Sequence, residues 1–290
     1  MRAALAVLVL LMSSAADAAQ LGVVLDAKTP YYEKVASIFE QKVHEARPDL
    51  AVSVCWAGAN QMARRNTLRR FMQTGFDGII AFGRGVCELA VDENEDTPLV
   101  LCGGQLSAPA ATKDVVDLTW RLPPEALITR LRQFKAINSI VVAYASPGPE
   151  LEAATAAAQA AGLAVTKADV SKDVNGLAGA QAVLFASCGC PAELDRVPAV
   201  SQAAKALKVP LATTFPGGEI TGALLSMYVD GPWMAAQAAQ AAVRLVAGDK
   251  KGIPRAVTPK ITFILNTSTA IALGLRTSGP VTDGLLLVSQ

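Results

Sequence analysis

The chain has 290 residues and a formal net charge of +1, and 52% of its residues are hydrophobic although only 5% are aromatic. A near-neutral chain without a run of basic residues is not expected to bind nucleic acid. The one histidine, His44, lies on the polar side of a predicted surface helix, which leaves no material for a His-assisted catalytic triad or a multi-His metal site. The length suffices for one large domain or two lobes, and we expect two.

The N-terminal residues have the pattern of a secretory signal peptide. Arg2 precedes an apolar core from Ala3 to Met12, and Ala16-Asp17-Ala18 offers small residues around a cleavage point. The core is short for a permanent span, and no cysteine stands at the expected lipid-attachment site. We therefore expect residues 1–18 to be removed and a free protein without stable membrane insertion to begin near Ala19 in the periplasm. A retained membrane anchor is the alternative.

Short apolar runs alternate with segments of helical spacing along the first half of the chain. Strands are predicted at 21–25, 51–55, 78–82 and 98–102, with helices at 31–45 and 61–74. A loop rich in Pro, Ala and Ser then leads to a strand-like segment at 115–120 and a helix at 125–134. This alternation is typical of an open parallel sheet with right-handed crossovers.

The second half repeats the cycle. Strands are predicted at 140–144, 164–168, 182–185, 211–213, 224–229 and 259–265, and helices at 150–161, 192–207 and 233–246. The sequence thus predicts an α/β fold of two Rossmann-like lobes, whose parallel sheets are joined by a multi-strand hinge. The expected N-terminal lobe is 19–117 plus 230–256, and the C-terminal lobe is 118–229 plus 257–290.

In element order the whole mature chain resembles the type I periplasmic binding proteins, and within them the ABC transporter substrate-binding family that includes tryptophan-binding lipoprotein-like proteins. The residues that carry this resemblance are Val209-Pro210-Leu211, the strand at 222–228, Leu245-Val246-Ala247-Gly248 and the run from Asn266 to Leu275. The resemblance implies a clamshell that closes on a small organic solute and presents it to an ABC permease in the inner membrane. It implies no enzyme activity and no cofactor. From the candidate contact residues described next, we expect that solute to be carboxylate- or amino-acid-like.

Ligands of open α/β sheets bind beyond the carboxyl ends of the strands, so the loops there supply the candidate contacts. Thr29 leads into a helix that carries Tyr31 and Tyr32, of which one is expected to face the cleft and to stack on a solute. In Gly83-Arg84-Gly85, a guanidinium flanked by two glycines can approach a carboxylate or phosphate and bind it bidentately. A solvated arginine or an interlobe salt bridge is the alternative for Arg84.

The remaining candidates lie at equivalent strand ends or near the second lobe crossing. They are Gly103, Ser146, Ser187, Phe215, Tyr228 and Asp230. Asp230 could hold an amino group, and a carboxylate facing Arg84 would suit a zwitterion, although it would equally suit an ion pair that closes the empty protein. Asn266 and Thr267 are interpreted as a structural turn rather than as part of the hinge.

Five cysteines are an odd number for an oxidising compartment. Cys87 follows the third predicted strand and Cys102 ends the fourth, so a bridge between them is geometrically reasonable. Cys188-Gly189-Cys190 would form only a strained bridge, and a labile redox pair, a soft-metal site or free thiols stay open. A periplasmic ligand sensor, or a redox or metal partner without a transport role, is therefore the alternative function.

Overall fold

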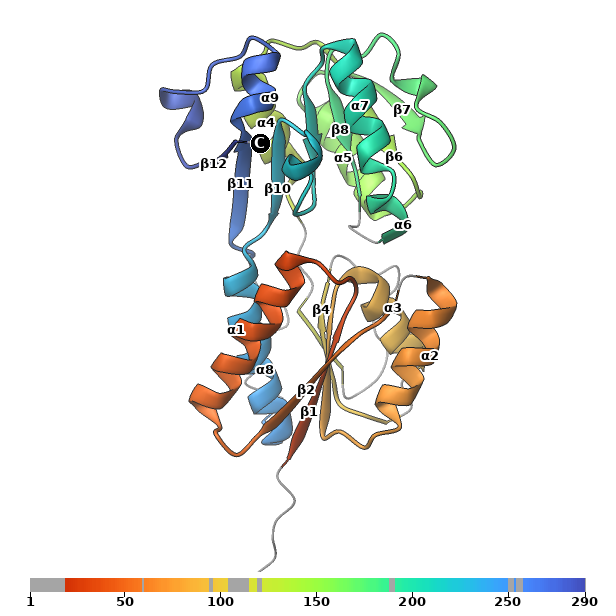
Figure 1. The fold of residues 1–290 in the computed structure, drawn as a ribbon, viewed down its shortest axis with the longest axis vertical. Helices are drawn as coiled ribbons and strands as arrows, with labels where there is room; N and C mark the ends of the chain where they lie inside the picture. The colour runs from red at the N-terminus through yellow and green to blue at the C-terminus, as the bar shows by residue number, and fades with distance from the viewer. Residues whose placement is uncertain are drawn as a thin grey trace, which may run out of the picture.

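The computed structural model describes residues 19–58, 60–93, 96–103, 115–118, 122–187, 191–249, 253 and 258–289. They form two lobes stacked end to end, each built around one sheet (Figure 1). The predicted signal peptide, Cys188 and Cys190 lie outside the described residues. Within the described part of the chain, no helix has the length and apolar character that crossing a membrane requires.

The sheet of the first lobe is parallel, and its described strands lie in the order β2-β1-β3-β4-β5. The strands are β1 (Gln20–Leu25), β2 (Ala51–Trp56), β3 (Gly78–Phe82), β4 (Leu99–Cys102) and β5 (Val115–Asp117). The central strands β3 and β4 are buried along their whole length, because helices cover both faces of the sheet. Their continuous apolar runs follow from that double cover.

Two pairs of helices cover this sheet. On one face lie α1 (Pro30–Ala46) and α8 (Gly231–Val246), which run side by side, and on the other lie α2 (Gln61–Met72) and α3 (Arg84–Glu93) (Figure 1). Although α8 follows the strands of the second lobe in sequence, its buried alanines complete the core against α1. The first lobe is therefore not contiguous in sequence.

The described strands of the second lobe lie in the order β12-β11-β10-β9-β8-β6-β7. The strands are β6 (Ser139–Tyr144), β7 (Ala164–Asp169), β8 (Val183–Phe185), β9 (Leu211–Thr213), β10 (Leu225–Val229), β11 (Ile261–Asn266) and β12 (Leu286–Val288). β10 and β11 pair antiparallel, whereas the other pairs are parallel as predicted. The chain returns from the first lobe after α8, so β11 enters the second sheet from the side at which β10 leaves it.

The helices of the second lobe pack on both faces of its sheet. On one face lie α4 (Pro124–Phe134), α5 (Pro149–Ala160) and α9 (Thr267–Ala272), and on the other lies α7 (Val197–Leu207). The short segments are α6 (Pro191–Leu194), η1 (Asn175–Leu177), η2 (Glu219–Thr221) and η3 (Pro280–Thr282).

The single helix predicted at 192–207 is wrong, because the chain breaks into α6 and α7 at Asp195-Arg196. Pro198 stands in the first turn of α7, where its missing N–H costs nothing. Inside one continuous helix its ring would clash with the carbonyl of Leu194. The proline therefore forces a new helix start.

The chain passes between the lobes after β5, after β10 and after α8. Asp230 stands at the second passage and caps α8, since its Oδ1 accepts a hydrogen bond from the Trp233 N–H at 2.9 Å. The predicted lobe bounds, 19–117 plus 230–256 and 118–229 plus 257–290, stay a prediction.

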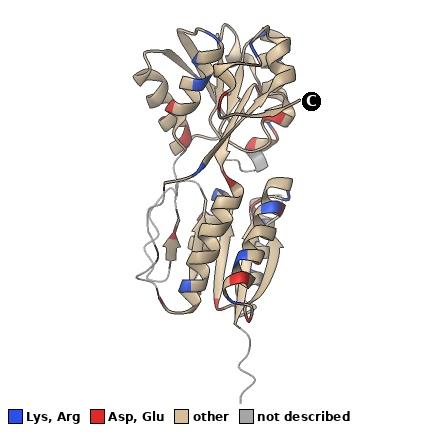
Figure 2. Cartoon of the chain, turned by 90° about the vertical axis from the view of Figure 1, so that its left-hand side faces the viewer, with Lys and Arg blue, Asp and Glu red and all other residues tan. Residues whose placement is uncertain are grey.

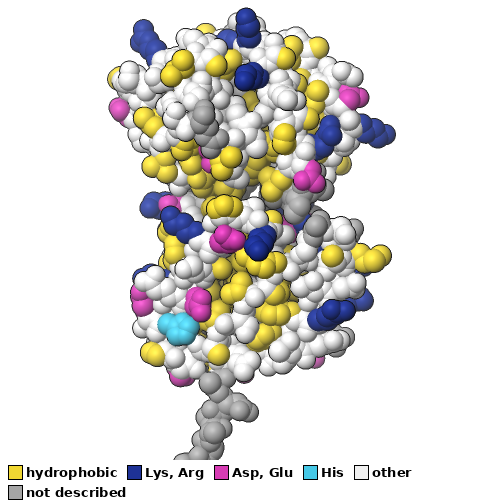
Figure 3. Space-filling view, viewed as in Figure 1, with side chains coloured by type: hydrophobic (Ala, Val, Ile, Leu, Met, Phe, Trp, Pro, Cys, Tyr) yellow, Lys and Arg dark blue, Asp and Glu magenta, His cyan; other side chains and the backbone are white. Residues whose placement is uncertain are grey.

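Acidic and basic residues are interspersed over both lobes (Figure 2), and a waist separates the lobes on the face shown in Figure 3.

Candidate functional site

A cavity of about 140 Å³ lies between the lobes. Its wall consists of segments that follow the carboxyl ends of strands in both sheets, together with the starts of α1, α3, α4 and α5. The central cavity is lined by Thr29, Tyr31, Tyr32, Gly83, Arg84, Cys102, Gly103, Leu122, Pro124, Pro149, Glu150, Ala153, Ser187, Leu194, Thr214, Phe215, Pro216, Tyr228, Val229 and Met234. Strand ends from two sheets therefore converge on one space.

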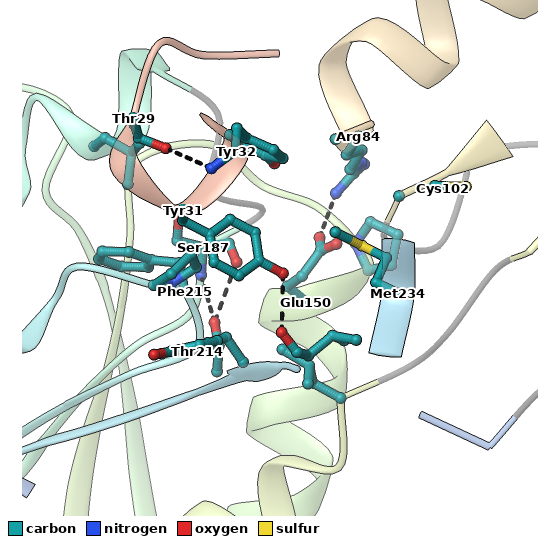
Figure 4. A pocket seen from close by; sticks show the side chains of 18 of the residues that line it. Thr29, Tyr31, Tyr32, Arg84, Cys102, Glu150, Ser187, Thr214, Phe215 and Met234 are labelled. Atoms are coloured by element: carbon teal, nitrogen blue, oxygen red, sulfur yellow. Dashed lines mark hydrogen bonds and ion pairs between the residues drawn. The ribbon is translucent and has the colours of Figure 1, made fainter. Parts of the chain in front are cut away.

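Tyrosines form one wall of the central cavity. The ring of Tyr31 packs edge-on against Tyr32, with centroids 5.3 Å apart, and against Tyr228 at 5.6 Å. The Tyr31 hydroxyl donates a hydrogen bond to the Val229 carbonyl at 2.9 Å and so ties α1 to the end of β10 (Figure 4). Burial, with Glu219 and Asp230 nearby, raises the pKa of Tyr228 to about 12, so its hydroxyl group stays neutral near pH 7. The wall is rigid and suited to stacking.

An ion pair crosses the cleft. Arg84 begins α3 in the first lobe, Glu150 lies in the first turn of α5 in the second, and Arg84 Nη1 donates to Glu150 Oε2 (Figure 4). Arg84 Nε also donates to Glu88 Oε1 at 3.0 Å. A cation at a helix N-terminus interacts unfavourably with the helix dipole, whereas an anion there interacts favourably. The carboxylates of Glu88 and Glu150 together offset the unfavourable interaction of Arg84 with the dipole of α3. Arg84 is thus held between two carboxylates.

A buried ion pair supports the turn that carries Arg84. Asp26, at the end of β1, accepts a hydrogen bond from the Gly85 N–H at 3.2 Å and lies 3.3 Å from Arg64 Nη1. A Cβ on Gly85 would lie 2.7 Å from that Arg64 atom, so a larger residue there would force the guanidinium of Arg64 to shift. Gly83 has a φ of +107°, a conformation that favours glycine. Burial raises the pKa of Asp26, although Arg64 and the Gly85 amide lower it.

Hydroxyl groups line the wall from the second lobe. Ser187 follows β8, and its Oγ donates to Glu193 Oε2 at 2.7 Å. Its N–H donates to Thr214 Oγ1 at 3.3 Å, while the Thr214 hydroxyl donates to the Ser187 carbonyl at 3.1 Å. These bonds hold the ends of β8 and β9 in a fixed relation and leave hydroxyl oxygens at the cavity surface.

The structure brings most of the sequence-predicted site residues to the central cavity. They are Thr29, Tyr31, Tyr32, Gly83, Arg84, Gly103, Ser187, Phe215 and Tyr228. Asp230 instead lines a neighbouring pocket at the hinge, Gly85 lies behind Arg84 against Asp26, and Ser146 is exposed.

The sequence analysis missed Glu150, Thr214, Leu122 and Met234, which line the same cavity. A signal existed for Glu150, since it directly follows Pro149 at a helix start and an anion is favoured there.

The predicted bridge between Cys87 and Cys102 is not formed, and both side chains are buried free thiols. The Cys87 thiol donates to the Ala81 carbonyl at 3.3 Å, which turns it back toward β3. Burial raises the pKa of both thiols and keeps them protonated, a state of low reactivity. Cys102 nevertheless lines the central cavity.

The two-lobed α/β architecture, with strand ends converging on an interlobe cavity, is the type I periplasmic binding protein fold. The chain is similar to an ABC domain of Streptococcus pneumonia in complex with L-Trp, with a TM-score of 0.79 and 14% identity over 93% of this chain and 99% of that one. A conserved domain protein from Vibrio cholerae also gives 0.79, with 16% identity over 94% and 100% of the two chains.

A third similar structure is the open, ligand-free form of CD0873, a substrate-binding protein with adhesive properties from Clostridium difficile. Its TM-score is 0.71, with 16% identity over 94% of this chain and 99% of that one. No protein-family model matches the chain, and no curated protein matches its sequence. At these identities the likeness establishes the fold.

Proposed function

We propose that this protein is the periplasmic solute-binding component of an ABC-type uptake system, which captures a small organic ligand between its lobes and makes or breaks no bond. The observation that carries the proposal is the central cavity, lined from the carboxyl ends of strands in both sheets. A ligand there touches both lobes at once, so its binding energy favours the closed arrangement over the open one. The similar structures that bind solutes support this role.

The proposed ligand is amino-acid-like or carries a carboxylate. Arg84 is paired with Glu150 across the cleft, so the carboxylate of a ligand could take the place of Glu150 on the Arg84 guanidinium. Tyr31, Tyr228 and Phe215 provide an aromatic surface for its body. A cavity near 140 Å³ suits a compact molecule, because a cavity of about 150 Å³ holds benzene.

The proposed ligand contacts are the nine predicted residues that line the central cavity, and Glu150 and Thr214 join them. The signal peptide at 1–18, the periplasmic location and an inner-membrane ABC permease as partner belong to the same proposal. A sensory role would use the same closure with a different membrane partner.

Native mass spectrometry of protein released gently from the periplasm tests the proposal. We expect a stoichiometric organic adduct of low mass, which denaturation releases and which an Arg84→Ala variant loses. Arg47→Ala is the matched control, because Arg47 is half-exposed and pairs with Asp49 on the surface of the first lobe. Protein that is always empty, and whose melting temperature no metabolite changes, would contradict solute binding.

A further inference from the structure

A second pocket opens on the hinge side of the cleft. Its volume is about 550 Å³, and it shares Thr29, Tyr31, Phe215, Tyr228 and other wall residues with the central cavity. The two pockets therefore adjoin each other at the tyrosine wall. Charged residues line this hinge pocket from both lobes, namely Lys34, Glu219 and Asp230.

Glu219 is the unusual residue of the hinge pocket. Its exposed fraction is only 6%, and among the described residues its Oε2 has no hydrogen-bond partner. A buried carboxylate oxygen without a donor is unfavourable, because burial removes its hydrogen bonds to water and no protein donor replaces them. A donor from outside the protein would remove that penalty.

The backbone under Glu219 is firmly held. The Asn266 side-chain amide donates to the Glu219 carbonyl at 2.8 Å, and the Gly222 N–H donates to the same oxygen at 3.1 Å. A Cβ on Gly218 would lie 2.1 Å from Thr213 Oγ1, so the turn is pressed against β9 and requires glycine there. The carboxylate is thus placed by tertiary structure.

The other acid of the hinge pocket is already engaged. Asp230 Oδ1 caps α8, while its Oδ2 accepts from Thr262 Oγ1 at 3.4 Å and lies 3.6 Å from Lys260 Nζ. At the far side of the cleft, Arg84 is held by Glu88 and Glu150. Among the described residues, Glu219 is therefore the acid of these two pockets that has a buried carboxylate oxygen without a hydrogen-bond donor.

The surroundings suit a cation. Tyr31, Tyr228 and Phe215 line the same space, and aromatic rings attract ammonium groups to their faces. The charge of Glu219 acts on this wall, since Glu219 is the largest cause of the raised pKa of Tyr228 after burial. An ammonium group carries three donors and no acceptor, which matches a carboxylate beside aromatic rings.

We propose that the hinge pocket is a subsite for a primary ammonium group, which Glu219 accepts, with the rest of the ligand lying along the tyrosine wall toward the central cavity. The inference rests on the proposed function and deepens it, because it makes the ligand an organic amine, amino acids included. It moves the amine-binding role from Asp230, where the sequence suggested it, to Glu219. Because Oε2 is covered in this structure, the ammonium reaches it through a change of the Glu219 side-chain rotamer.

Calorimetric titration with matched probes tests the subsite. The probes are 2-phenylethylamine, 2-phenylethanol and phenylacetate, together with the smaller pair butylamine and butanol. We expect each amine to bind wild-type protein about tenfold or more tighter than its alcohol, since a charge-assisted hydrogen bond is gained. Glu219→Gln should abolish that preference and leave the binding of the alcohols unchanged.

Glu152→Gln is the matched control, because Glu152 lies on the same lobe, is 70% exposed and pairs with Lys167. Equal binding of amine and alcohol to wild-type protein would overturn the subsite, even if Glu219→Gln failed to fold. Failure of every amine to bind at millimolar concentration, in protein from which a co-purified solute has first been identified and then removed, would also overturn it while the proposed function stands. If no solute and no probe binds, both fail.

Discussion

Single residues set the electrostatics of the cleft. Arg84 occupies the N-terminal end of α3, where the helix dipole opposes a positive charge, and three elements compensate for it. Glu88 comes from its own helix, Glu150 from the other lobe, and Asp26 orders the turn below it through the Gly85 amide. The arginine is thus positioned by acids on both sides of the cleft.

The pH dependence of stability should reveal the buried Asp26. Burial raises its pKa above the ordinary value of 3.8, so the folded state favours the protonated form. Its contribution to stability is then fully present below pH 3.8 and is lost as the pH rises through the raised pKa. We expect the free energy of unfolding of Asp26→Asn, minus that of wild type, to increase from below pH 3.8 to neutrality.

Urea denaturation over that pH range measures the difference. In the variant, Arg64 lacks its carboxylate partner at every pH. This shifts the difference in the free energy of unfolding by a constant and does not change how that difference depends on pH. A difference that decreases with pH would mean that Arg64, not burial, dominates the pKa of Asp26.

The hydroxyl of Tyr31 should have a measurable structural role. It donates to the Val229 carbonyl where the chain leaves β10 for α8, so Tyr31→Phe removes one buried hydrogen bond at the hinge. We expect the free energy of unfolding to fall by about 1 kcal/mol, measured by chemical denaturation. Tyr144→Phe, at the half-buried end of β6, is the control and should change it by less than about 0.5 kcal/mol.

At the scale of elements, the N-termini of α3 and α5 face each other across the cleft through Arg84 and Glu150. The side chains are 12% and 23% exposed, so solvent screens the pair only in part. Because the partners belong to different lobes, the pair stabilises the approach of the lobes rather than either lobe alone.

Removing this pair should open the ligand-free protein. We expect Glu150→Gln to shift the distribution of interlobe distances toward longer values, measured by fluorescence energy transfer between one dye on each lobe. The shift should correspond to about 0.2–1 kcal/mol, the range of partly exposed ion pairs. Glu152→Gln removes an equal charge from α5, but its pair with Lys167 lies inside the second lobe, so the distances should not change. Equal distributions in the two variants would contradict a role in closure.

At the scale of the whole molecule, α8 makes the first lobe depend on residues that come after most of the second. Ala235, Ala238 and Ala242 of α8 complete the core formed by Val35 and Phe39 of α1. Without α8, the apolar face of α1 would be exposed to water. The first lobe should therefore not be stable as the contiguous segment alone.

A fragment of residues 19–118 should fail to unfold cooperatively, whereas the same fragment fused through a flexible linker to residues 230–249 should do so. Circular dichroism during thermal unfolding distinguishes the two. A cooperative transition of the shorter fragment at the same temperature would show that α8 is dispensable.

Local patterns predicted most elements because alternating apolar runs and helical spacing are local properties. The strand of residues 21–25 and the helix of 31–45 are found within one residue of β1 and α1. The break at Asp195-Arg196 was missed, although Pro198 signals it, because the apolar spacing continues across the break. The antiparallel pairing of β10 with β11 depends on the path of α8 through the other lobe, which no local pattern encodes.

The same distinction explains the site. Strand ends could be located from sequence, so Thr29, Arg84 and Ser187 were predicted and lie at the cavity. Glu150 was missed because its role depends on which helix start of the second lobe faces Arg84. The burial of Glu219 likewise results from packing between η2, β9 and β11. The polar and glycine-rich composition of this turn is typical of an exposed loop, so the sequence does not predict that Glu219 is buried.

The discontinuous lobes also set the order in which the chain can fold as it is synthesised. The core of the first lobe closes only after α8, which ends at Val246, and the sheet of the second closes only after β12, at Leu286–Val288. A domain normally folds as soon as its last segment has emerged from the ribosome. Here the first lobe cannot be completed before residue 246, and the second cannot be completed before residue 288. The cores of both lobes are therefore expected to be completed late, after most of the chain has been synthesised.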